Sequence, residues 1–330
     1  MGSHCGQANV AIFLCILAVV LAEQATGTTT TTQAPPSKKE LKIAAFNVQV
    51  FGVTKMKKTE VVEVLVRIIR RYDVILIQEI RDASGEAIIE LLEEINDSQE
   101  HNYEITLSER LGRTSSKEQY AFLYRSGIGL DVVSTYQYPD KADKFERPPF
   151  AILLKIPNSD IKQMALIAIH TSPKEAEAEI DALVDVRLAV MKQWRINNVL
   201  IMGDFNAASP YTTKTEMAKI RLRDSKYLWL IPDDMDTTIS RSDSAYDRFV
   251  VTGKELTNSI VPDSAKTFRF NEAYKLDLEE SKDVSDHFPI EFAIKLGTSG
   301  STSAGNRKRG FISRVKEFAR GLFSSDHHEL

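Results

Sequence analysis

Carboxylate, amide and imidazole side chains stand at the ends of apolar segments at four places in this sequence. They are Glu79 after the run 74–77, His170 after 164–169, Asp204 and Asn206 after 199–202, and Asp286 with His287 before the last apolar segment, 288–294. A charge is costly inside a buried strand, so it is placed at the strand end, where several strands can converge on one pocket. Carboxylate and amide oxygens are hard ligands for a divalent cation, and imidazoles transfer protons near neutral pH. The pattern therefore predicts a hydrolytic site.

Each of these residues also has a plainer interpretation on its own. Glu79 could be a solvated cap, His170 a hydrogen-bonded residue at a strand end, and Asp204 a turn residue that accepts backbone hydrogen bonds. For no site to exist, four separate interpretations of this kind would all have to be true, each for residues at the end of an apolar segment. A shared site is therefore the better account of the pattern.

The elements that would position these residues begin with alternating strands and helices. Strands are predicted at 41–48, 74–78, 103–107, 120–124, 130–138, 150–156 and 164–169, and helices at 57–72, 86–95 and 176–194. The first helical segment carries Val61, Leu65 and Ile68 at helical spacing. Helices on either side of a series of consecutive strands indicate two packed sheets with helices outside, an α/β fold.

The N-terminal residues are predicted to be a targeting segment followed by a spacer. Residues 1–22 contain an apolar run too short for a typical transmembrane helix, so we expect a signal peptide cleaved after Ala22 and a secreted protein. Cys5 and Cys15 both lie in this segment, so the mature chain is expected to form no disulfide. Residues 23–40 are rich in Thr and Pro, a composition typical of a spacer.

The body of the chain, residues 41–296, is long enough for one large domain with a sizeable core. Residues 297–306 are predicted to be a flexible linker, and residues 307–330 a basic amphipathic tail. In 307–323, apolar residues recur at helical spacing with Arg and Lys opposite, which indicates binding to a membrane surface or to chromatin. The alternative is a helix that docks on its own body. The terminal His-His-Glu-Leu is close to an ER-retrieval signal.

The formal net charge of −4 at pH 7 hides an uneven distribution of charge. Residues 298–330 hold six basic side chains against three acidic ones, so the body is more acidic than the whole chain. An acidic body is a poor general binder of polyanions, and the basic tail could compensate for it.

Longer stretches of the body are recognisable as well. They are LKIAAFNV (41–48), RRYDVILIQEIRD (70–82), MGDFNA (202–207), IRLR (220–223), WLIPD (229–233), AYDRFVV (245–251) and SDHFPIE (285–291). On these motifs the body resembles the deoxyribonuclease I family along nearly its whole length. The resemblance implies a four-layer α/β/β/α sandwich and an endonuclease that cuts DNA to 5′-phosphate and 3′-hydroxyl ends with Mg²⁺ (or Mn²⁺) and Ca²⁺.

The resemblance also implies roles for single residues of these motifs. The metal and phosphate pocket would comprise Asn47, Glu79, Asp204, Asn206 and Asp286. The acid/base imidazoles would be His170, oriented by Glu118, and His287, oriented by Asp247. One ring would take a proton from water while the other serves the leaving 3′-oxygen, and the sequence leaves open which ring does which.

Contacts with DNA and structural calcium follow from the same resemblance. Arg81 would read the minor groove, while Arg147 and Tyr246 would contact the DNA backbone. The calcium ligands would be Asp140, Asp143 and Phe145 at one site and Asp236 and Thr238 at the other. The departures from the family are Ser209 and Ser244 in place of a disulfide, Pro148 in place of a calcium-site glutamate, and Ser116 in place of a DNA-packing tyrosine.

Changes at Ile105, Leu107 and Phe150 argue against the actin binding that some family members show, and a monomer is expected. Asn96 begins a glycosylation sequon, Asn-Asp-Ser. One rival is a phosphodiesterase of the same fold acting on another substrate, such as an inositol phosphate or sphingomyelin. The other is an inert extracellular protein that binds DNA or membranes. The intact set of acidic, amide and imidazole residues argues against this alternative.

Overall fold

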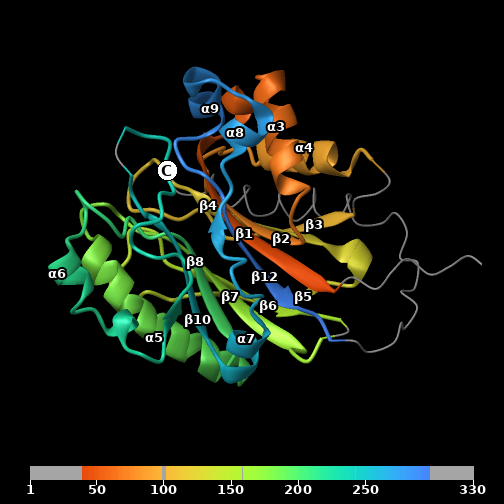
Figure 1. Cartoon of the computed structure of the whole chain (residues 1–330). Helices are drawn as coiled ribbons and strands as arrows, with labels where there is room; N and C mark the ends of the chain where they lie inside the picture. The colour runs from red at the N-terminus through yellow and green to blue at the C-terminus, as the bar shows by residue number, and fades with distance from the viewer. Residues whose placement is uncertain (1–38, 99–101, 158, 242, 298–330) are drawn as a thin grey trace, which may run out of the picture. The chain divides into compact units, whose positions relative to one another are not determined.

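The computed structural model describes residues 39–98, 102–157, 159–241 and 243–297, and two six-stranded sheets lie within them. The strands of the first sheet are β1 (Glu40–Phe51), β2 (Val74–Ile80), β3 (Tyr103–Leu107), β4 (Gln119–Arg125), β11 (Lys266–Thr267) and β12 (Ile290–Lys295). Those of the second are β5 (Asp131–Gln137), β6 (Phe150–Lys155), β7 (Gln163–His170), β8 (Val199–Asp204), β9 (Leu228–Trp229) and β10 (Asp247–Thr252). The orders are β11-β12-β1-β2-β4-β3 and β5-β6-β7-β8-β10-β9 (Figure 1).

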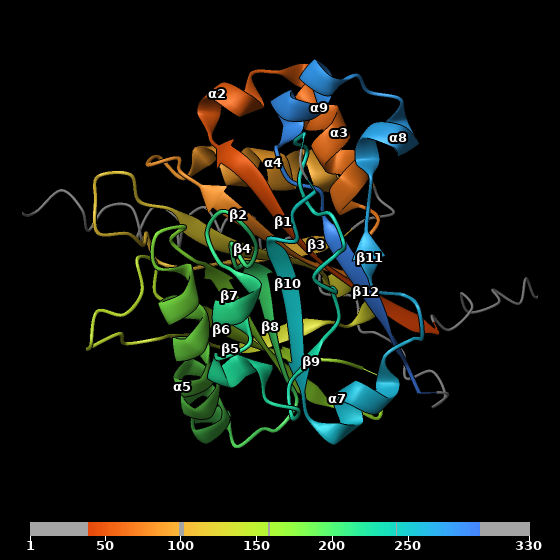
Figure 2. The same ribbon diagram turned by 60° about the vertical axis from the view of Figure 1, so that its left-hand side comes forward.

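Helices cover the outer face of each sheet (Figure 2). Packed on the first sheet are α2 (Val53–Met56), α3 (Thr59–Ile69), α4 (Glu86–Asn96), α8 (Phe270–Tyr274) and α9 (Leu278–Val284). Packed on the second are α5 (Ala176–Trp194) and α6 (Lys214–Met217), while α7 (Lys254–Ser259) contacts β10 and β12. Two short 3₁₀ helices span Ser126–Ile128 and Arg221–Arg223. The layers are therefore helix, sheet, sheet and helix, and the predicted four-layer sandwich is confirmed.

Strand β1 shows why the predicted strands read as continuous apolar runs. Its side chains alternate between the two faces of the sheet, as in any strand. Ile43 and Ala45 face the second sheet, and Ala44 and Phe46 face the helices. All four side chains are fully buried. A strand covered on both faces has no solvent side, so only its ends can carry polar residues cheaply.

Strand pairing brings these polar ends together. Strands β1 and β2 run parallel with Asn47 opposite Gln78. Strands β7 and β8 also run parallel with His170 opposite Asp204, and antiparallel β10 places Asp247 opposite the same aspartate. Because parallel strands end at the same edge of a sheet, each sheet presents its polar residues at one edge.

The side chain of Gln78 joins the two sheets at this edge. Its Nε2 donates to the Ile169 carbonyl in β7 over 2.8 Å, and its Oε1 accepts from the Asp204 backbone N–H in β8 over 3.0 Å. Gly203 leaves the necessary space, because a Cβ there would lie 2.2 Å from the Ile169 carbonyl oxygen and 2.9 Å from Gln78 Nε2. The bridge therefore holds the end of β2 against the ends of β7 and β8.

All the strands and helices predicted from the sequence are present, with ends that differ by a few residues. The predicted helix 57–72 is shorter because Lys58 is extended (φ −92°, ψ 92°) and precedes its first turn. The sequence interpretation did not include the short helices α2 and α6 to α9, nor strands β9 to β11. Most of these elements are only one or two turns or a few residues long, so they have too little periodicity to be recognised.

Several predictions concern residues outside the described ranges. They are the signal peptide 1–22, nearly all of the spacer 23–40, the linker 297–306 after its first residue, the tail 307–330 with its His-His-Glu-Leu terminus, and both cysteines. Strand β1 begins at Glu40 and so takes in the last residue of the predicted spacer. Within the part of the chain that the structure describes, no helix is long and apolar enough to span a membrane.

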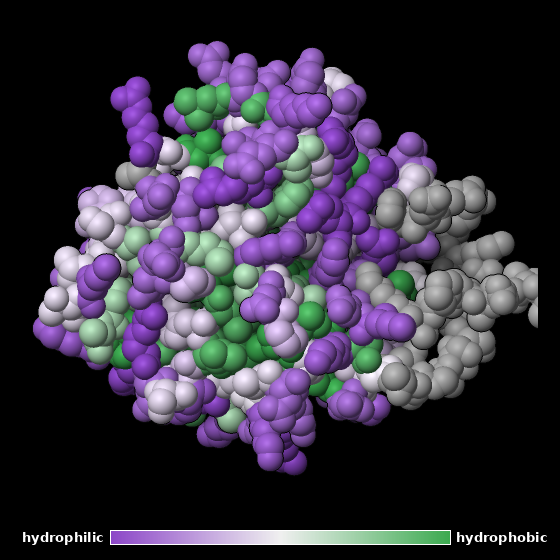
Figure 3. Space-filling model, viewed as in Figure 1, coloured by the Kyte–Doolittle hydropathy of each residue, from purple (hydrophilic) through white to green (hydrophobic). Residues whose placement is uncertain are grey.

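Polar side chains dominate the surface over α3, α8 and α9, and hydrophobic ones show lower in the same view, around β8, β10 and β12 (Figure 3).

At the end of α4, the amide of the sequon residue Asn96 donates to the Tyr103 carbonyl over 2.9 Å and accepts from the Tyr103 N–H over 2.8 Å. This amide therefore joins α4 to β3, and a glycan would have to share its nitrogen with that contact.

Candidate active site

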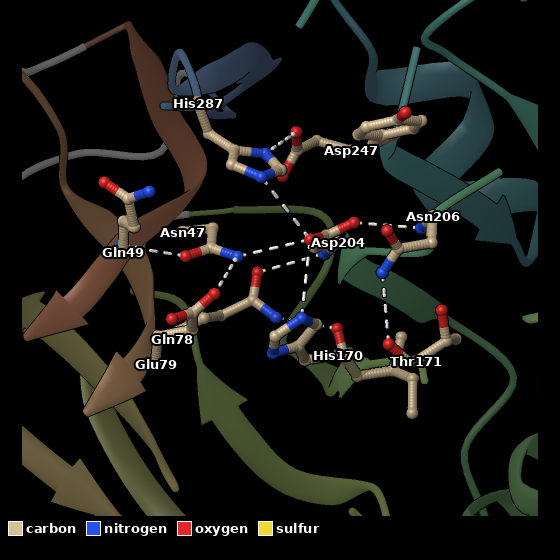
Figure 4. A network of polar contacts seen from close by, with 12 residues as sticks. Asn47, Gln49, Gln78, Glu79, His170, Thr171, Asp204, Asn206, Asp247 and His287 are labelled. Carbon is tan, nitrogen blue, oxygen red and sulfur yellow. Dashed lines mark hydrogen bonds and ion pairs between the residues drawn. The ribbon is translucent and has the colours of Figure 1, made fainter. Parts of the chain in front are cut away.

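The carboxylate of Asp204 lies at the centre of the polar edge (Figure 4). It is buried at the end of β8, and its Oδ2 accepts a hydrogen bond from Asn47 Nδ2 over 3.2 Å. The same oxygen lies 3.5 Å from His170 Nε2 and 3.6 Å from His287 Nε2. One carboxylate oxygen is thus flanked by two imidazole rings that come from opposite directions.

Each imidazole is held from behind by a buried carboxylate. His170 Nδ1 lies 2.9 Å from Glu118 Oε2, and His287 Nδ1 lies 2.7 Å from Asp247 Oδ2. A carboxylate bonded to Nδ1 fixes the orientation of the ring and leaves Nε2 for chemistry. Both Nε2 atoms therefore point into the space around Asp204.

The carboxylates also set the charge state of this pocket. Burial lowers the pKa of His287, but the negative charges of Asp247 and Asp204 outweigh it and raise the pKa to about 10. Burial likewise raises the pKa of Glu118, but its hydrogen bond to His170 and nearby positive charges lower the pKa to about 2. Hence His287 is an imidazolium and Glu118 a carboxylate at neutral pH.

Glu79 occupies the side of the site formed by the first sheet. Its Oε1 accepts from Asn47 Nδ2 over 3.1 Å, and its Oε2 accepts from the Val50 backbone N–H over 2.9 Å. Arg81 Nη2 lies 2.9 Å from Glu79 Oε2 and 3.0 Å from Glu118 Oε1. This guanidinium therefore connects the predicted metal side of the pocket to the carboxylate that holds His170.

Asn206 and Asp286 complete the predicted pocket. The backbone N–H of Asn206 donates to Asp204 Oδ1 over 2.9 Å, and its side-chain Nδ2 donates to the Thr171 carbonyl over 3.1 Å. Asp286 is half-exposed, with Oδ1 at 3.9 Å from His287 Nε2. The five residues of the predicted metal and phosphate pocket thus lie around one point of the structure.

The predicted DNA contacts lie at the rim of this pocket. Arg147 donates to the carbonyls of His170 and Thr171 over 3.1 and 3.2 Å. The ring of Tyr246 lies 6.2 Å from that of His287 and 5.3 Å from that of Tyr211. Positive charge and exposed aromatic surface therefore border the two imidazoles.

The oxygen atoms of the site fit a divalent cation. Asp204, Asp247 and His287 offer ligand atoms that lie within 4.8 Å of one another. Asp247 Oδ2 is already bonded to His287 Nδ1, and each oxygen of Asp204 already accepts a hydrogen bond. Among the described residues, Asp286 Oδ1 is one of the buried oxygens without a hydrogen-bond partner. Hard oxygen donors of this kind suit Mg²⁺ or Mn²⁺.

Comparison with known proteins agrees with this geometry. Residues 44–287, a range that begins in β1 and ends at His287, match the endonuclease/exonuclease/phosphatase family. The chain is 44% identical to deoxyribonuclease-1 of Bos taurus over 260 residues, which cover 77% of this chain and 92% of that protein. The chain belongs to the deoxyribonuclease I family. It is also 41% identical to deoxyribonuclease gamma of Mus musculus over 285 residues, which cover 84% of this chain and 91% of that protein.

Similarity to solved structures extends the fold beyond the deoxyribonuclease I family. An endonuclease/exonuclease/phosphatase family protein from Leptotrichia buccalis superimposes with a TM-score of 0.56 at 18% identity, over 77% of this chain and 99% of that chain. At this identity the similarity concerns the fold alone. The deoxyribonuclease I family depends on divalent metal, in agreement with the oxygen-rich pocket.

The first calcium loop implied by the deoxyribonuclease I resemblance lies between β5 and β6. Asp140 Oδ2 accepts from the backbone N–H of Phe145 over 2.7 Å. Asp143 Oδ1 lies 2.9 Å from Arg113 Nε, and the Asp143 carbonyl accepts from Arg113 Nη2 over 2.6 Å. An ion at this loop would therefore share Asp143 with a guanidinium, and calcium binding here stays a prediction.

The second loop backs directly onto the His287 side of the site. Asp236 Oδ1 accepts from the backbone N–H groups of Thr238 and Ser244, each over 3.1 Å. Its Oδ2 accepts from Arg269 Nη2 over 3.2 Å. Ser244 is one of the two positions at which the resemblance implies a lost disulfide, and its backbone N–H here bonds the loop to Asp236. Calcium at Asp236 and Thr238 stays a prediction, in which the ion would have to compete with Arg269.

Three residues that position the site were not recognised in the sequence. Gln78 bridges the two sheets, and the signal that could have revealed it is a polar residue at the end of an apolar strand. Tyr120 accepts from the His170 N–H over 2.9 Å and donates to the Arg147 carbonyl over 3.3 Å. Ser285 donates from Oγ to the Asn47 carbonyl over 2.6 Å. The roles of Tyr120 and Ser285 depend on tertiary contacts that no local pattern reveals.

Proposed function

We propose that this chain is a divalent-metal-dependent endodeoxyribonuclease that hydrolyses phosphodiester bonds of DNA to 5′-phosphate and 3′-hydroxyl ends. The observation that carries the proposal is the convergence of two ring nitrogens, His170 Nε2 and His287 Nε2, on Asp204 Oδ2. Displacement at phosphorus needs a base for the attacking water and an acid for the leaving oxygen. The two relatives named as deoxyribonucleases support DNA as the substrate.

His287 is the proposed proton donor. Although burial lowers its pKa, Asp247 and Asp204 raise the pKa to about 10, so the ring holds a proton at neutral pH. Its Nε2 would give this proton to the 3′-oxygen as the phosphorus–oxygen bond breaks. His170 Nε2 would accept a proton from the attacking water as the new phosphorus–oxygen bond forms. Glu118 and Asp247 would hold the rings in place during both transfers.

The proposed ligands of the cation and phosphate are Asn47, Glu79, Asp204, Asn206 and Asp286. When bound, the cation would offset the negative charge that grows on the phosphoryl oxygens. Asn47 Nδ2 bonds both Glu79 and Asp204, over 3.1 and 3.2 Å, so these two carboxylates are already side by side. A pocket arranged in this way needs little rearrangement before it binds a cation.

Arg81, Arg147 and Tyr246 are the proposed contacts with DNA. Both guanidiniums lie beside Glu118, where their charge can meet a phosphate that approaches His170. We assign Arg81 to the minor groove and Arg147 to the DNA backbone. The ring of Tyr246 stands next to His287 and is assigned to the backbone on the other side of the scissile bond.

A plasmid-nicking assay with His170→Ala and His287→Ala tests the proposal. A general acid or base contributes typically about 10²–10⁴-fold, so each variant should lose at least about 10²-fold in nicking rate. Wild-type nicking should require Mg²⁺ or Mn²⁺ and stop with EDTA, and the product should carry 5′-phosphate ends that a ligase can join.

Glu255→Ala is a matched control for loss of a side-chain contact. Its carboxylate accepts from Asn198 Nδ2 over 2.7 Å at the opposite end of β8. This variant should nick at nearly the wild-type rate. Nicking by either histidine variant within a few-fold of wild type, at matched circular dichroism, would contradict the two-imidazole assignment. Hydrolysis of an inositol phosphate or sphingomyelin without DNA cleavage would point to another substrate.

We further propose secretion through residues 1–22, action as a monomer, and binding of chromatin or a membrane surface by residues 307–330. The tail supplies positive charge that the acidic body lacks. Truncation after Leu296 should then leave plasmid nicking nearly unchanged but slow the cleavage of nucleosomal or liposome-bound DNA. Equal loss on all substrates would mean that the tail is needed for the folded body.

A further inference from the structure

The ammonium of Lys55 lies in a site made of three backbone carbonyls. Lys55, in α2, donates from Nζ to the carbonyls of Val48, Gln49 and Val284, each over 2.7 Å. The first two carbonyls belong to β1 and the third to the last residue of α9. Segments more than 200 residues apart in the chain are therefore joined through one cation.

The backbone explains why these carbonyls converge. Gln49 and Val50 have φ values of +44° and +51°, in the left-handed region, and the pairing of β1 with β2 changes register between Asn47 and Phe51. Two successive carbonyls of β1 therefore turn out of the sheet. Val284 ends α9, and the last carbonyls of a helix lack partners within the helix and attract positive charge. The result is a cation site formed from the backbone of two segments.

These two segments carry opposite halves of the active site. On the β1 side, Asn47 precedes the bulge, and the Val50 N–H holds Glu79 Oε2 over 2.9 Å. On the α9 side, Ser285 donates to the Asn47 carbonyl, and its Oγ accepts from the His287 backbone N–H over 3.0 Å. The contact of Lys55 therefore joins the metal side of the pocket to the turn that carries His287, beside the direct hydrogen bond from Ser285 to the Asn47 carbonyl.

The charge of Lys55 suits this role. Burial lowers the pKa of Lys55 to about 8, while the negative charges of Asp286 and Glu79 act to raise it. The side chain is therefore mainly an ammonium at neutral pH, with its three N–H donors matched to three acceptors. Its donors are used on the backbone, so Lys55 itself is not placed to transfer a proton to substrate.

We propose that Lys55 is a positioning residue, whose ammonium fills a three-carbonyl cation site and thereby places His287 and Asp286 against Asn47 and Glu79. The test of this proposal by DNA nicking rests on the proposed nuclease function. Its test by binding of an ammonium ion does not. A site of this kind should accept a small primary ammonium ion when the lysine side chain is shortened.

The test is chemical rescue of Lys55→Ala with propylammonium, which replaces the atoms that the substitution removes. A misplacement of about 1 Å costs about 10²-fold in rate, so kcat for nicking should fall by about that factor with little change in KM. Propylammonium should restore kcat along a saturable curve and raise the melting temperature. Tetramethylammonium at equal ionic strength has no N–H donor and should do neither.

Two further variants separate positioning from stability. Lys55→Met keeps the apolar stem and fills the space, so it should fold, nick as poorly as Lys55→Ala, and show no response to propylammonium. Lys58→Ala is the matched control, because Lys58 forms an exposed pair with Asp283 over 2.7 Å in the same region. Exposed pairs contribute little, so Lys58→Ala should resemble wild type in every assay.

Three results of the nicking and melting assays would overturn the proposal. They are wild-type nicking by Lys55→Met, a folded but inactive Lys55→Ala that propylammonium neither restores nor stabilises, and equal rescue by tetramethylammonium. If Lys55→Ala is unfolded, recovery of the native circular dichroism spectrum on addition of propylammonium supports the cation site, and no recovery refutes it. If wild type does not cut DNA, the melting shift and the His287 ring signals in NMR spectra of Lys55→Ala with and without propylammonium still test the cation site. Ring signals that propylammonium leaves unchanged would refute the positioning of His287.

Discussion

Replacement of Gly203 by alanine should separate the two imidazole–carboxylate halves of the site. Gly203 has φ +134°, and a Cβ there would lie 2.2 Å from the Ile169 carbonyl oxygen, well under the 3.0 Å that real Cβ atoms keep. Strands β7 and β8 must therefore move apart by about 1 Å, and such a misplacement costs about 10²-fold in rate. His170 follows Ile169 and Asp204 follows Gly203, so both functional side chains are displaced.

The same substitution should also destabilise the fold. Overpacking of a close-packed site costs about 1–3 kcal/mol, and the strained backbone adds to it. Gly253→Ala is the matched control, because Gly253 has φ +102° and its Cβ would lie 2.4 Å from Asn198 Oδ1. Gly253 follows β10 opposite Asn198, beyond the other end of β8 and about 20 Å from Asp204 at 3.3 Å per residue.

Plasmid nicking well below the melting temperature, together with melting curves by circular dichroism, distinguishes the two variants. Both should melt at lower temperature than wild type, and only Gly203→Ala should lose about 10²-fold in nicking rate. The reasoning is refuted if folded Gly203→Ala nicks within a few-fold of wild type. It is also refuted if Gly253→Ala loses as much activity as Gly203→Ala.

Two further predictions concern charge. In Asp247→Asn, the pKa of His287 should fall from about 10 towards the ordinary 6.5. NMR titration of the ring without metal would measure this fall. An unchanged titration would exclude Asp247 as the main partner of His287. Because the pKa of His287 is raised in the folded state, its protonated ring contributes to the free energy of unfolding fully below about pH 6.5, and this contribution disappears as the pH rises towards 10. The loss of stability over this alkaline range should therefore be smaller in Asp247→Asn. In Arg269→Ala, Ca²⁺ should raise the melting temperature more than in wild type, because the guanidinium no longer competes for Asp236 Oδ2; an equal rise would remove Asp236 from the calcium ligands.

The sequence was informative where burial restricts polar residues. Glu79, His170 and Asp204 follow strands that are buried on both faces, and a charge at such a strand end is costly unless other groups surround it. Two sheets were predicted on a different ground, because helices on either side of a series of consecutive strands indicate two packed sheets. The partners Glu118, just before β4, and Asp247, at the start of β10, came only from the family resemblance.

Other parts of the site depend on backbone directions that residue types do not encode. Lys55 looks like any surface lysine in the sequence, and its role appears only when Gln49 and Val50 adopt positive φ and turn two carbonyls towards it. The ion pairs of Asp143 with Arg113 and of Asp236 with Arg269 are long-range contacts as well. Motif comparison assigned those aspartates to calcium without revealing the cations that already contact them.

The order of strands in the two sheets makes activity depend on the completion of the chain. The second sheet is built from one continuous stretch, Asp131 to Thr252, whereas the first takes strands from both sides of that stretch. Its last strand, β12, pairs with its first, β1, and Asp286 and His287 immediately precede it.

During synthesis, the middle of the chain can therefore fold before the site exists. A chain that stops before residue 286 would retain Glu79, His170 and Asp204 but lack the proposed proton donor His287, and without β12 it would leave β1 as an open edge prone to pairing with other chains. A premature stop ahead of residue 286 is therefore expected to give a chain that lacks the proposed nuclease activity and that exposes a strand edge prone to aggregation.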